Sequence, residues 1–334
     1  MCHKISVIMP VLNGEKYIGE AVESIASQTF RDFELIVVND GSTDRTCEQL
    51  ERFAGRIDLR LVHHSKPQGI ARSVNDGIRH ATGQYIAFLD HDDLWFPEFL
   101  ATQLAHLEKY PDVGMVHSDF QTVDSEGNIL EASVAACRNR RRVSGHVFPA
   151  LFMDSFIVGN SVLIRKECFD KLGAFDHTLR IGDYHMWLRI ARHYKVDYTP
   201  MVLTKYRQHR TQDSRTFSAE DTPPGLAALQ SILEMYPEVT QELGKSSIRR
   251  RMASLYLDMA NPAFSSNQGR AARVFLKKAI GLHPLNPRLY GIYAASFLGP
   301  SQARLAKKIW HAFGRRPIRA GTTPSQQSAS VSRG

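Results

Sequence analysis

The first 120 residues alternate short apolar runs with longer amphipathic stretches. Apolar runs bounded by polar residues predict buried strands. Between them, apolar residues recur every three or four positions, which is the spacing of one face of a helix. Strands that alternate with helices predict βαβ units, hence an α/β fold with a mostly parallel, Rossmann-like central sheet flanked by helices. The predicted strands are Ser6–Met9, Leu35–Val38, Leu59–Val62 and Tyr85–Leu89, and the helical spacings are Ile18, Val22, Ile25 and Ile70, Val74, Ile78.

The pattern changes twice further along the chain. Residues 121–150 are polar and irregular, with four arginines between Arg138 and Arg142, and we expect a surface excursion there. Apolar order returns at Phe156–Ile164, and beyond Thr222–Pro224 the sequence becomes all-helical. We therefore expect a first domain of residues 1–218, a helical extension of residues 219–318 and a disordered tail of residues 319–334.

The helical extension contains two amphipathic patterns. Ala272, Phe275, Leu276 and Ala279 share one helical face, followed by Pro284 and Pro287, which is similar to one helical hairpin of the tetratricopeptide kind. A solenoid needs about three such repeats, so a helical tail packed on the rest of the chain is the simpler expectation. Residues 303–316, ARLAKKIWHAFGRR, predict a basic amphipathic helix with an aromatic side chain, which is typical of a membrane interface.

Charge is distributed unevenly along the 334 residues. The net charge is +8, but residues 259–334 hold twelve Lys or Arg and no Asp or Glu, so the preceding part carries about −4. A basic tail favours contact with an anionic membrane surface, with a merely solvated basic surface as the alternative. The basic residues lack interleaved stacking aromatics, which disfavours nucleic acid as a partner.

Three further features bear on the compartment. No run of apolar residues is long enough to span a bilayer as a helix. The N-terminal segment is interpreted as a first strand rather than a signal peptide, and the four cysteines lack metal-type spacing, which predicts free thiols in a reducing compartment. We expect a cytoplasmic protein, peripheral on the inner face of the membrane; the oligomeric state is left open.

Polar, turn-forming residues follow three of the predicted strands. They are Pro10 to Gly14 after the first strand, Asn39 to Ser42 after the second, and Asp90 to Asp93 after the fourth. In an open α/β sheet, ligands bind beyond the carboxyl ends of the strands, so these segments are expected to border one crevice. Each alone is also explained as an ordinary turn.

The acidic segment raises a question of stability. Asp90, Asp92 and Asp93 are close enough for their charges to repel, and a cation would relieve that repulsion. Carboxylates separated by one residue suit Mg²⁺ or Mn²⁺, which prefer oxygen ligands and are commonly shared with substrate phosphates. A solvated acidic turn is the alternative. His91 is interpreted as a neighbour of this site, because hard cations prefer oxygen.

These motifs give the chain a specific resemblance. Residues 5–115 resemble the family 2 inverting glycosyltransferases of the bacterial surface-polysaccharide type, which have the A-type glycosyltransferase fold. The matching stretches include PVLNGEKYIGEAVESIASQ, VVNDGSTD and YIAFLDHDDLW, and further on RIGDYHMWLRIA and YRQHRTQDS. Together they cover about the first two-thirds of the chain.

The resemblance implies a role for individual residues. Donor binding is implied for Pro10, Val11, Leu12 and Asn13 beside the base, Asp40 as acceptor of a hydrogen bond from it, Gly69 and Asn75 on the next helix, and Asp90 near the ribose. Asp92 would reach the metal, which His209 approaches in some relatives. Asp183 would be the general base that deprotonates the acceptor hydroxyl. The implied donor is a nucleotide sugar, of the UDP type, and the implied acceptor is a glycan or lipid-linked glycan.

The sequence also departs from the family pattern. Gly182 stands where the family has a glutamate before the base, and His185 where an acidic residue is common; Val74 and Leu12 replace a common arginine and aromatic. Asp183 in this context has a second interpretation as a helix N-cap. Two rival functions follow: a catalytically degenerate scaffold that binds partners through its helical tail, and a sugar nucleotidyltransferase. The second lacks the glycine-rich, basic phosphate loop that it requires after the first strand.

Overall fold

The computed structural model describes residues 3–137, 143–179, 182–209, 223–265 and 269–297. The chain forms two compact units, Met1–Arg251 and Met252–Gly334, and the division falls inside helix α11 (Lys245–Ser265). The boundary that the sequence predicts near residue 218 lies among residues 210–222, outside the described residues, and stays a prediction.

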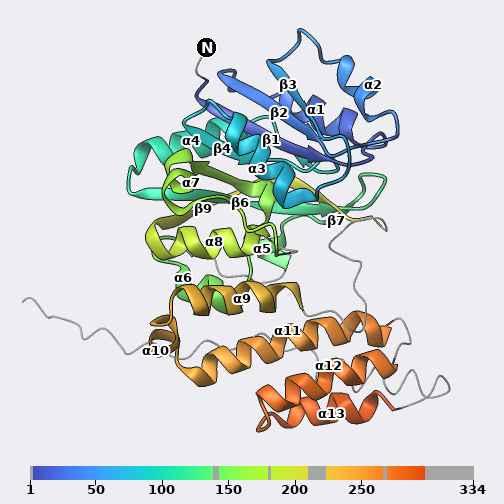
Figure 1. The fold of residues 1–334 in the computed structure, drawn as a ribbon, viewed down its shortest axis with the longest axis vertical. Coiled ribbons are helices and arrows are strands. Elements are labelled where there is room, and N and C mark those ends of the chain that lie inside the picture. The colour runs from blue at the N-terminus through green and yellow to red at the C-terminus, as the bar shows by residue number, and fades with distance from the viewer. Residues whose placement is uncertain (1–2, 138–142, 180–181, 210–222, 266–268, 298–334) are drawn as a thin grey trace, which may run out of the picture. The chain divides into compact units, whose positions relative to one another are not determined.

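The first unit is built on one mixed sheet (Figure 1). The strand order is β3-β2-β1-β4-β8-β6-β9-β5, and β7 pairs with β6. The first four strands of this order are mutually parallel, and β8 is antiparallel to both its neighbours. The strands are β1 Ile5–Val11, β2 Phe33–Asn39, β3 Leu59–His63, β4 Tyr85–Phe88, β5 Leu94–Trp95, β6 Val113–Val123, β7 Ile129–Glu131, β8 Val162–Arg165 and β9 Lys195–Arg207.

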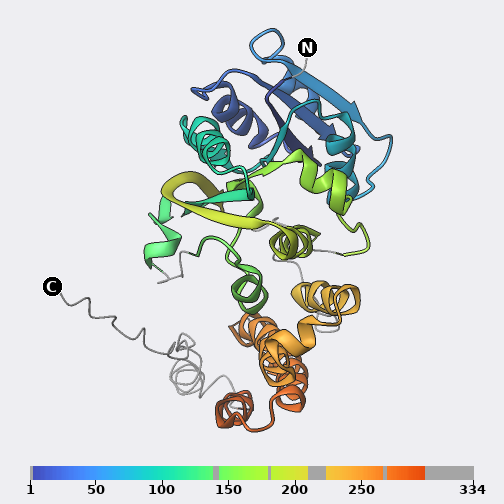
Figure 2. The same ribbon diagram turned by 90° about the vertical axis from the view of Figure 1, so that its left-hand side faces the viewer.

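Helices connect the strands and cover both faces of the sheet. Figure 2 shows α1 and α4 on one side of the first strands and α3 on the other. The helices of the first unit are α1 Ile18–Ala26, α2 Thr46–Glu51, α3 Ile70–His80, α4 Phe99–Lys109, α5 Val134–Cys137, α6 Phe148–Met153, α7 Lys166–Leu172, α8 Gly182–His193, α9 Pro224–Met235 and α10 Val239–Leu243, with a 3-10 turn η1 at Gly159–Ser161.

Strand β1 shows why the core runs on both sides of the sheet. Ile5, Val7 and Met9 belong to the core cluster that includes α1 and α4. Ile8 points to the opposite face, where α3 approaches so closely that a Cβ added to Gly77 would lie 2.4 Å from the Ile8 Cγ2 atom. A strand that is buried on both faces must be apolar throughout, which confirms the α/β fold predicted from these runs.

Four strands of the sheet were not predicted from the sequence: β5, β6, β7 and β9. β6 extends to Val123 and β7 follows it, both inside the segment expected to be a surface excursion. β6 is buried along its whole length although it contains His117, Asp119 and Thr122. Polar side chains that find hydrogen-bond partners inside a fold conceal a buried strand from hydropathy patterns.

The second unit contains the end of α11 and a hairpin of α12 (Gly269–Leu282) and α13 (Pro287–Ala295). The apolar face predicted on α12 is buried against these neighbours. This confirms an all-helical C-terminal extension; its tetratricopeptide likeness stays a prediction. The predicted amphipathic helix of residues 303–316 and the tail 319–334 lie outside the described residues. Among those described, no helix has the length and hydropathy to cross a bilayer.

Candidate active site

The loops that follow β1 and β2 are joined by hydrogen bonds. The Asn13 backbone N–H donates to Ser42 Oγ and the Thr43 N–H donates back to Asn13 Oδ1, both at 2.9 Å. The Gly14 N–H donates to Thr46 Oγ1 at 2.9 Å. Asn13 has a φ of 53°, a left-handed conformation that asparagine tolerates better than most residues. The first two strand ends therefore form one connected rim, as their positions in the sequence predict.

Gly14 lies where this rim meets the acidic segment. A Cβ at this position would be 2.6 Å from the Val11 Cγ2 atom and 2.8 Å from the His91 ring. Both distances are shorter than van der Waals contact, so a larger residue would displace one of these neighbours. His91 is thus a packing neighbour of the first loop, in agreement with its interpretation as a non-ligand.

Asp40 is buried just after β2, and the hydrogen bonds to its carboxylate come from residues later in the chain. Its Oδ1 accepts from the Gln68 N–H and its Oδ2 from the Gly69 N–H, both at 2.8 Å. Gly69 precedes α3 with a φ of 97°, which glycine adopts without strain. Burial alone would raise the pKa of Asp40, but these bonds and one from His64 outweigh it and hold the pKa below its usual value.

His64 was not predicted and connects two carboxylates. Its Nδ1 lies 2.6 Å from Asp40 Oδ1, and its Nε2 lies 2.7 Å from Asp76 Oδ2. An ionised carboxylate only accepts hydrogen bonds, so both ring nitrogens must carry a proton for both contacts to be hydrogen bonds. His64 thereby fixes the orientation of Asp40 from a position outside the rim.

The acidic segment after β4 forms a cluster. Asp90, Asp92 and Asp93 each offer a carboxylate oxygen, and these atoms lie within 4.8 Å of one another. Asp92 and Asp93 are buried and Asp90 is partly exposed. Three converging carboxylates are a donor set that fits a hard divalent cation. The structure thus brings together the residues from which the sequence predicts a metal site.

Within this cluster, Asp93 is held by the protein itself. Its Oδ2 accepts a 2.6 Å bond from Asn160 Nδ2, and its Oδ1 accepts a 2.8 Å bond from the Arg207 N–H. Burial, followed by the charges of Asp92 and Asp90, raises its pKa well above the usual value. Asp93 therefore supports the shape of the cluster, which leaves Asp90 and Asp92 as the more suitable cation ligands.

Residues at the end of β9 and just after it contact the acidic cluster. Arg207 donates from Nε to the Asp92 carbonyl oxygen at 2.9 Å and from a terminal nitrogen to Glu20 Oε2 at 2.7 Å. His209 Nε2 lies 2.7 Å from Asp92 Oδ2, and its ring packs 5.2 Å from that of Tyr17. His209 is thus at the acidic cluster, as the resemblance implies. Arg207, in the same YRQH segment, was not singled out.

Asp183 lies in the first turn of α8. The helix begins at Gly182, so Asp183 lies inside its first turn, and its Oδ1 accepts a 2.6 Å bond from the N–H of the next residue, Tyr184, rather than from the N2 or N3 position that an N-cap would bind. Its Oδ2 faces Gly159, where an added Cβ would lie 4.0 Å away. The side chain keeps partial exposure, yet burial among surrounding atoms raises its pKa, against the smaller effect of the Tyr184 bond. A raised pKa makes a carboxylate a stronger base.

Asp183 and the acidic cluster are connected through one short backbone segment. Gly159 faces Asp183, and the next residue, Asn160, holds Asp93. The candidate base and the candidate metal site therefore both lie next to η1, although they are far apart in the sequence.

Three other residues singled out from the sequence are placed as follows. The Asn75 side-chain amide is paired at both ends with the Phe175 backbone, at 2.9 Å each, so its role toward a nucleotide stays a prediction. His185 is buried, with Nε2 3.2 Å from Ser231 Oγ on α9, and burial lowers its pKa to about 4. At Gly182 an added Cβ would meet only ordinary contacts of 3.5 Å or more, so packing does not require glycine there.

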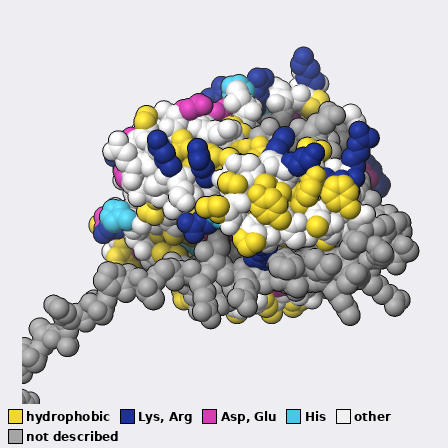
Figure 3. All heavy atoms as spheres, turned by 90° about the horizontal axis from the view of Figure 1, so that it is seen from below, with side chains coloured by type: hydrophobic (Ala, Val, Ile, Leu, Met, Phe, Trp, Pro, Cys, Tyr) yellow, Lys and Arg dark blue, Asp and Glu magenta, His cyan; other side chains and the backbone are white. Residues whose placement is uncertain are grey.

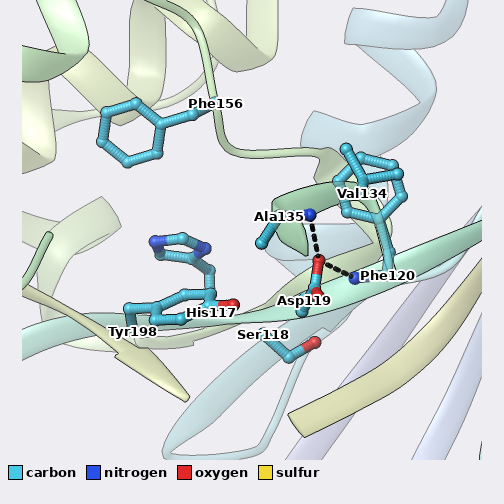
Figure 4. A pocket seen from close by; sticks show the side chains of 8 residues that line it. All are labelled: His117, Ser118, Asp119, Phe120, Val134, Ala135, Phe156 and Tyr198. Atoms are coloured by element: carbon cyan, nitrogen blue, oxygen red, sulfur yellow. Dashed lines mark hydrogen bonds between the residues drawn. The ribbon is translucent and has the colours of Figure 1, made fainter. Parts of the chain in front are cut away.

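A small cavity lies above β6 (Figure 4), with a volume of about 20 Å³. This is room for a water molecule but not for a sugar. The buried His117 Nε2 has no hydrogen-bond partner among the described residues, and burial lowers the pKa of this histidine to about 4. The residues that line the cavity are His117, Ser118, Asp119, Phe120, Val134, Ala135, Phe156 and Tyr198.

Comparison with known proteins decides the family. Residues 6–173 match the family model described as glycosyl transferase family 2. The chain belongs to glycosyltransferase family 2. An uncharacterized glycosyltransferase of Rickettsia typhi, RT0329, is 32% identical over 216 residues, which are 64% of this chain and 66% of that protein. The putative glycosyltransferase EpsE of Bacillus subtilis is 38% identical over 193 residues, 56% of this chain and 66% of EpsE. The matched part thus spans just under two thirds of these relatives.

Solved structures share the fold. TarS 1–349 of S. aureus in complex with UDP-GlcNAc has a TM-score of 0.63 and 18% identity, covering 93% of this chain and 90% of that one. The mannosyltransferase PcManGT of Pyrobaculum calidifontis, in complex with GDP-Man and Mn²⁺, has a TM-score of 0.56 and 19% identity, with 95% and 89% covered. At these identities the likeness concerns the fold, and it confirms the A-type glycosyltransferase architecture expected from the sequence.

Proposed function

We propose that this chain is a metal-dependent inverting glycosyltransferase. It moves a sugar from a nucleoside-diphosphate sugar, of the UDP type, to a hydroxyl group of a glycan or lipid-linked acceptor. The observation that carries the proposal is the backbone segment Gly159–Asn160, in which Gly159 lies next to Asp183 and Asn160 holds Asp93 of the acidic cluster.

The acidic cluster fits a cation by its chemistry. Asp90 and Asp92 would hold Mg²⁺ or Mn²⁺, with His209 beside Asp92, while Asp93 stays with its protein partners. A bound divalent cation supplies positive charge that offsets the charge of the departing diphosphate. In support, PcManGT, which has the same fold, was solved with Mn²⁺.

Asp183 is proposed as the general base. Its carboxylate takes the proton of the acceptor hydroxyl as that oxygen attacks the anomeric carbon, and the bond to the diphosphate oxygen breaks in the same displacement. One displacement inverts the anomeric configuration and requires no covalent enzyme intermediate. The pKa of Asp183 is raised by burial, which strengthens its carboxylate as a base.

The base of the donor is proposed to lie at the joined loops after β1 and β2. Pro10, Val11, Leu12 and Asn13 border this region, and Asp40 is held ionised by the Gln68 and Gly69 N–H groups. An ionised acceptor favours a base that presents an N–H group, such as the uracil imide. The bound UDP-GlcNAc of TarS and GDP-Man of PcManGT define the two donor classes to compare.

The first experiment is calorimetric binding of UDP, dTDP and GDP, each with and without Mn²⁺. We expect UDP to bind in a Mn²⁺-dependent manner, and binding to be lost in Asp92→Asn but kept in Asp183→Asn, which should abolish transfer. Asp170→Asn, an exposed carboxylate paired with Lys166, is the matched control. If folded protein binds none of the nucleotides, the catalytic proposal is wrong and the scaffold alternative takes its place.

A further inference from the structure

The outer face of helix α12 is basic. Its exposed residues Arg270, Val274, Lys277 and Lys278 are spaced four, seven and eight positions from the first, so they form one stripe along the helix. The opposite stripe is the buried one that packs in the second unit. Neither α12 nor α13 nor the turn between them contains an acidic residue, and the nearest one in the chain is Asp258 on α11.

The partner helix α13 and the turn before it expose large apolar side chains. Leu285, in the turn, is 90% exposed; Tyr290, on α13, is 48% exposed, and Phe297, two residues beyond the end of α13, is 61% exposed. The Arg273 guanidinium lies 4.5 Å from the centroid of the Phe297 ring and donates a 2.7 Å hydrogen bond to the Ser296 carbonyl oxygen. These two contacts hold the residues that follow α13 against α12. Figure 3 shows hydrophobic side chains gathered beside Lys and Arg side chains.

This combination fits one kind of partner. Exposure of an apolar side chain such as Leu285 to water is unfavourable. Its transfer into a lipid interface lowers the free energy. Lysines and arginines beside them are attracted to anionic headgroups, and their alkyl stems can lie along the apolar region. Leu285, the most exposed of these side chains, is aliphatic and offers no stacking contact to a nucleotide base, so a nucleic acid would leave it in water, whereas a lipid interface would bury it.

The remaining segment of this chain is a poor occupant of the same surface. Residues 298–334 contain seven Lys or Arg and no Asp or Glu, so they are repelled by the basic stripe of α12. An anionic surface, by contrast, is complementary to both segments.

We propose that the α12–α13 hairpin is a docking surface for an anionic lipid membrane. Leu285, Tyr290 and Phe297 enter the interface, and Arg270, Lys277 and Lys278 contact the headgroups. The inference is independent of the transfer chemistry, because none of these residues belongs to the candidate active site.

Co-sedimentation of the full chain with vesicles tests the surface. One set of vesicles is phosphatidylcholine alone, and the other is phosphatidylcholine and phosphatidylglycerol in equal parts. We expect binding to the anionic vesicles, reduced by about tenfold or more in Lys277→Glu/Lys278→Glu, and reduced likewise in Leu285→Ser/Tyr290→Ser, whose side chains are exposed and leave the core unchanged.

Two double variants in the first unit are the matched controls. Lys166→Glu/Lys171→Glu makes the same change in net charge, and Ile129→Ser/Leu130→Ser removes exposed apolar side chains of similar size. Both should bind vesicles as the unchanged chain does. UDP binding, measured in parallel, separates a failure of this surface from a failure of the proposed function.

Three results would overturn the proposal. The first is equal binding to both kinds of vesicle, or no binding to either. The second is unchanged binding in both hairpin variants. The third is that the hairpin variants instead abolish self-association, measured by light scattering, or binding to double-stranded DNA, which would assign the surface to a second copy or to a nucleic acid.

Discussion

Asn160 donates a 2.6 Å hydrogen bond to the buried carboxylate of Asp93, a residue 67 positions earlier in the chain. Asn160→Ala would leave a buried carboxylate with one donor fewer, which costs about 1–3 kcal/mol of the free energy of unfolding. We expect that loss in urea denaturation, together with weaker Mn²⁺-dependent UDP binding. Asn128→Ala is the control, because Asn128 makes a similar 3.0 Å bond to Asp124 at an exposed turn. Equal losses in the two variants would contradict the role given to Asn160.

His64 makes a second prediction possible. It connects Asp40 and Asp76, and His64→Gln retains at most one of the two connections. If Asp40 receives the nucleotide base, its looser orientation should weaken UDP binding by about tenfold, the size of one lost hydrogen bond to a charged group. The neighbouring His63→Gln, at an exposed position, should bind UDP as the unchanged protein does. Calorimetry that finds no difference between the two variants would remove His64 from the site.

Gly14 gives a prediction of stability. Gly14→Ala places a methyl group within 2.6 Å of Val11 and 2.8 Å of His91, and we expect it to cost about 1–3 kcal/mol by overpacking. Gly19→Ala is the control: it lies in α1, where the nearest atom to an added Cβ is 3.7 Å away, and alanine favours a helix over glycine. Thermal unfolding should show a lower Tm for the first variant and an unchanged or higher Tm for the second.

The buried histidines predict a loss of stability in acid. Burial lowers the pKa of His117 and of His185 from 6.5 to about 4. The unfolded chain therefore binds protons that the folded chain does not, and the free energy of unfolding should fall as the pH drops from about 6.5 to about 4. Asp93 and Asp183, whose pKa values are raised by burial, act in the opposite direction.

Urea denaturation across this pH range measures the effect. His117→Phe keeps a ring beside Phe156 and Tyr198 but binds no proton, so its stability should depend less steeply on pH. A slope identical to that of the unchanged protein would show that His117 is protonated in the folded state as easily as in the unfolded one.

The sequence predicts the first half of the sheet well because its strands are buried on both faces and hence apolar throughout. The strands β6 and β9 escaped prediction for the opposite reason. β6 buries His117, Asp119 and Thr122, and Asp119 is satisfied by the Phe120 and Ala135 N–H groups, the second of which is 16 residues away. Hydropathy cannot distinguish such a strand from an exposed polar segment.

In the candidate site, too, some residues could be predicted from the sequence and others could not. Asp40, Asp90, Asp92 and Asp183 stand out because they follow strands or match family motifs. The residues that orient them do not, since His64 and Asn160 are recognised only through partners distant in the sequence. A side chain that acts through a long-range hydrogen bond leaves no local pattern.

The long separation between the acidic cluster and β9 also has a consequence in time. Asp93 and Arg207 are 114 residues apart, and Asp92 and His209 are 117 apart. At a synthesis rate of about 5–20 residues per second, the acidic segment leaves the ribosome roughly 6–23 seconds before the residues at the end of β9 that contact it. During that interval its carboxylates depend on water and ions alone. The acidic cluster should therefore reach its folded arrangement only after residue 209 has been made.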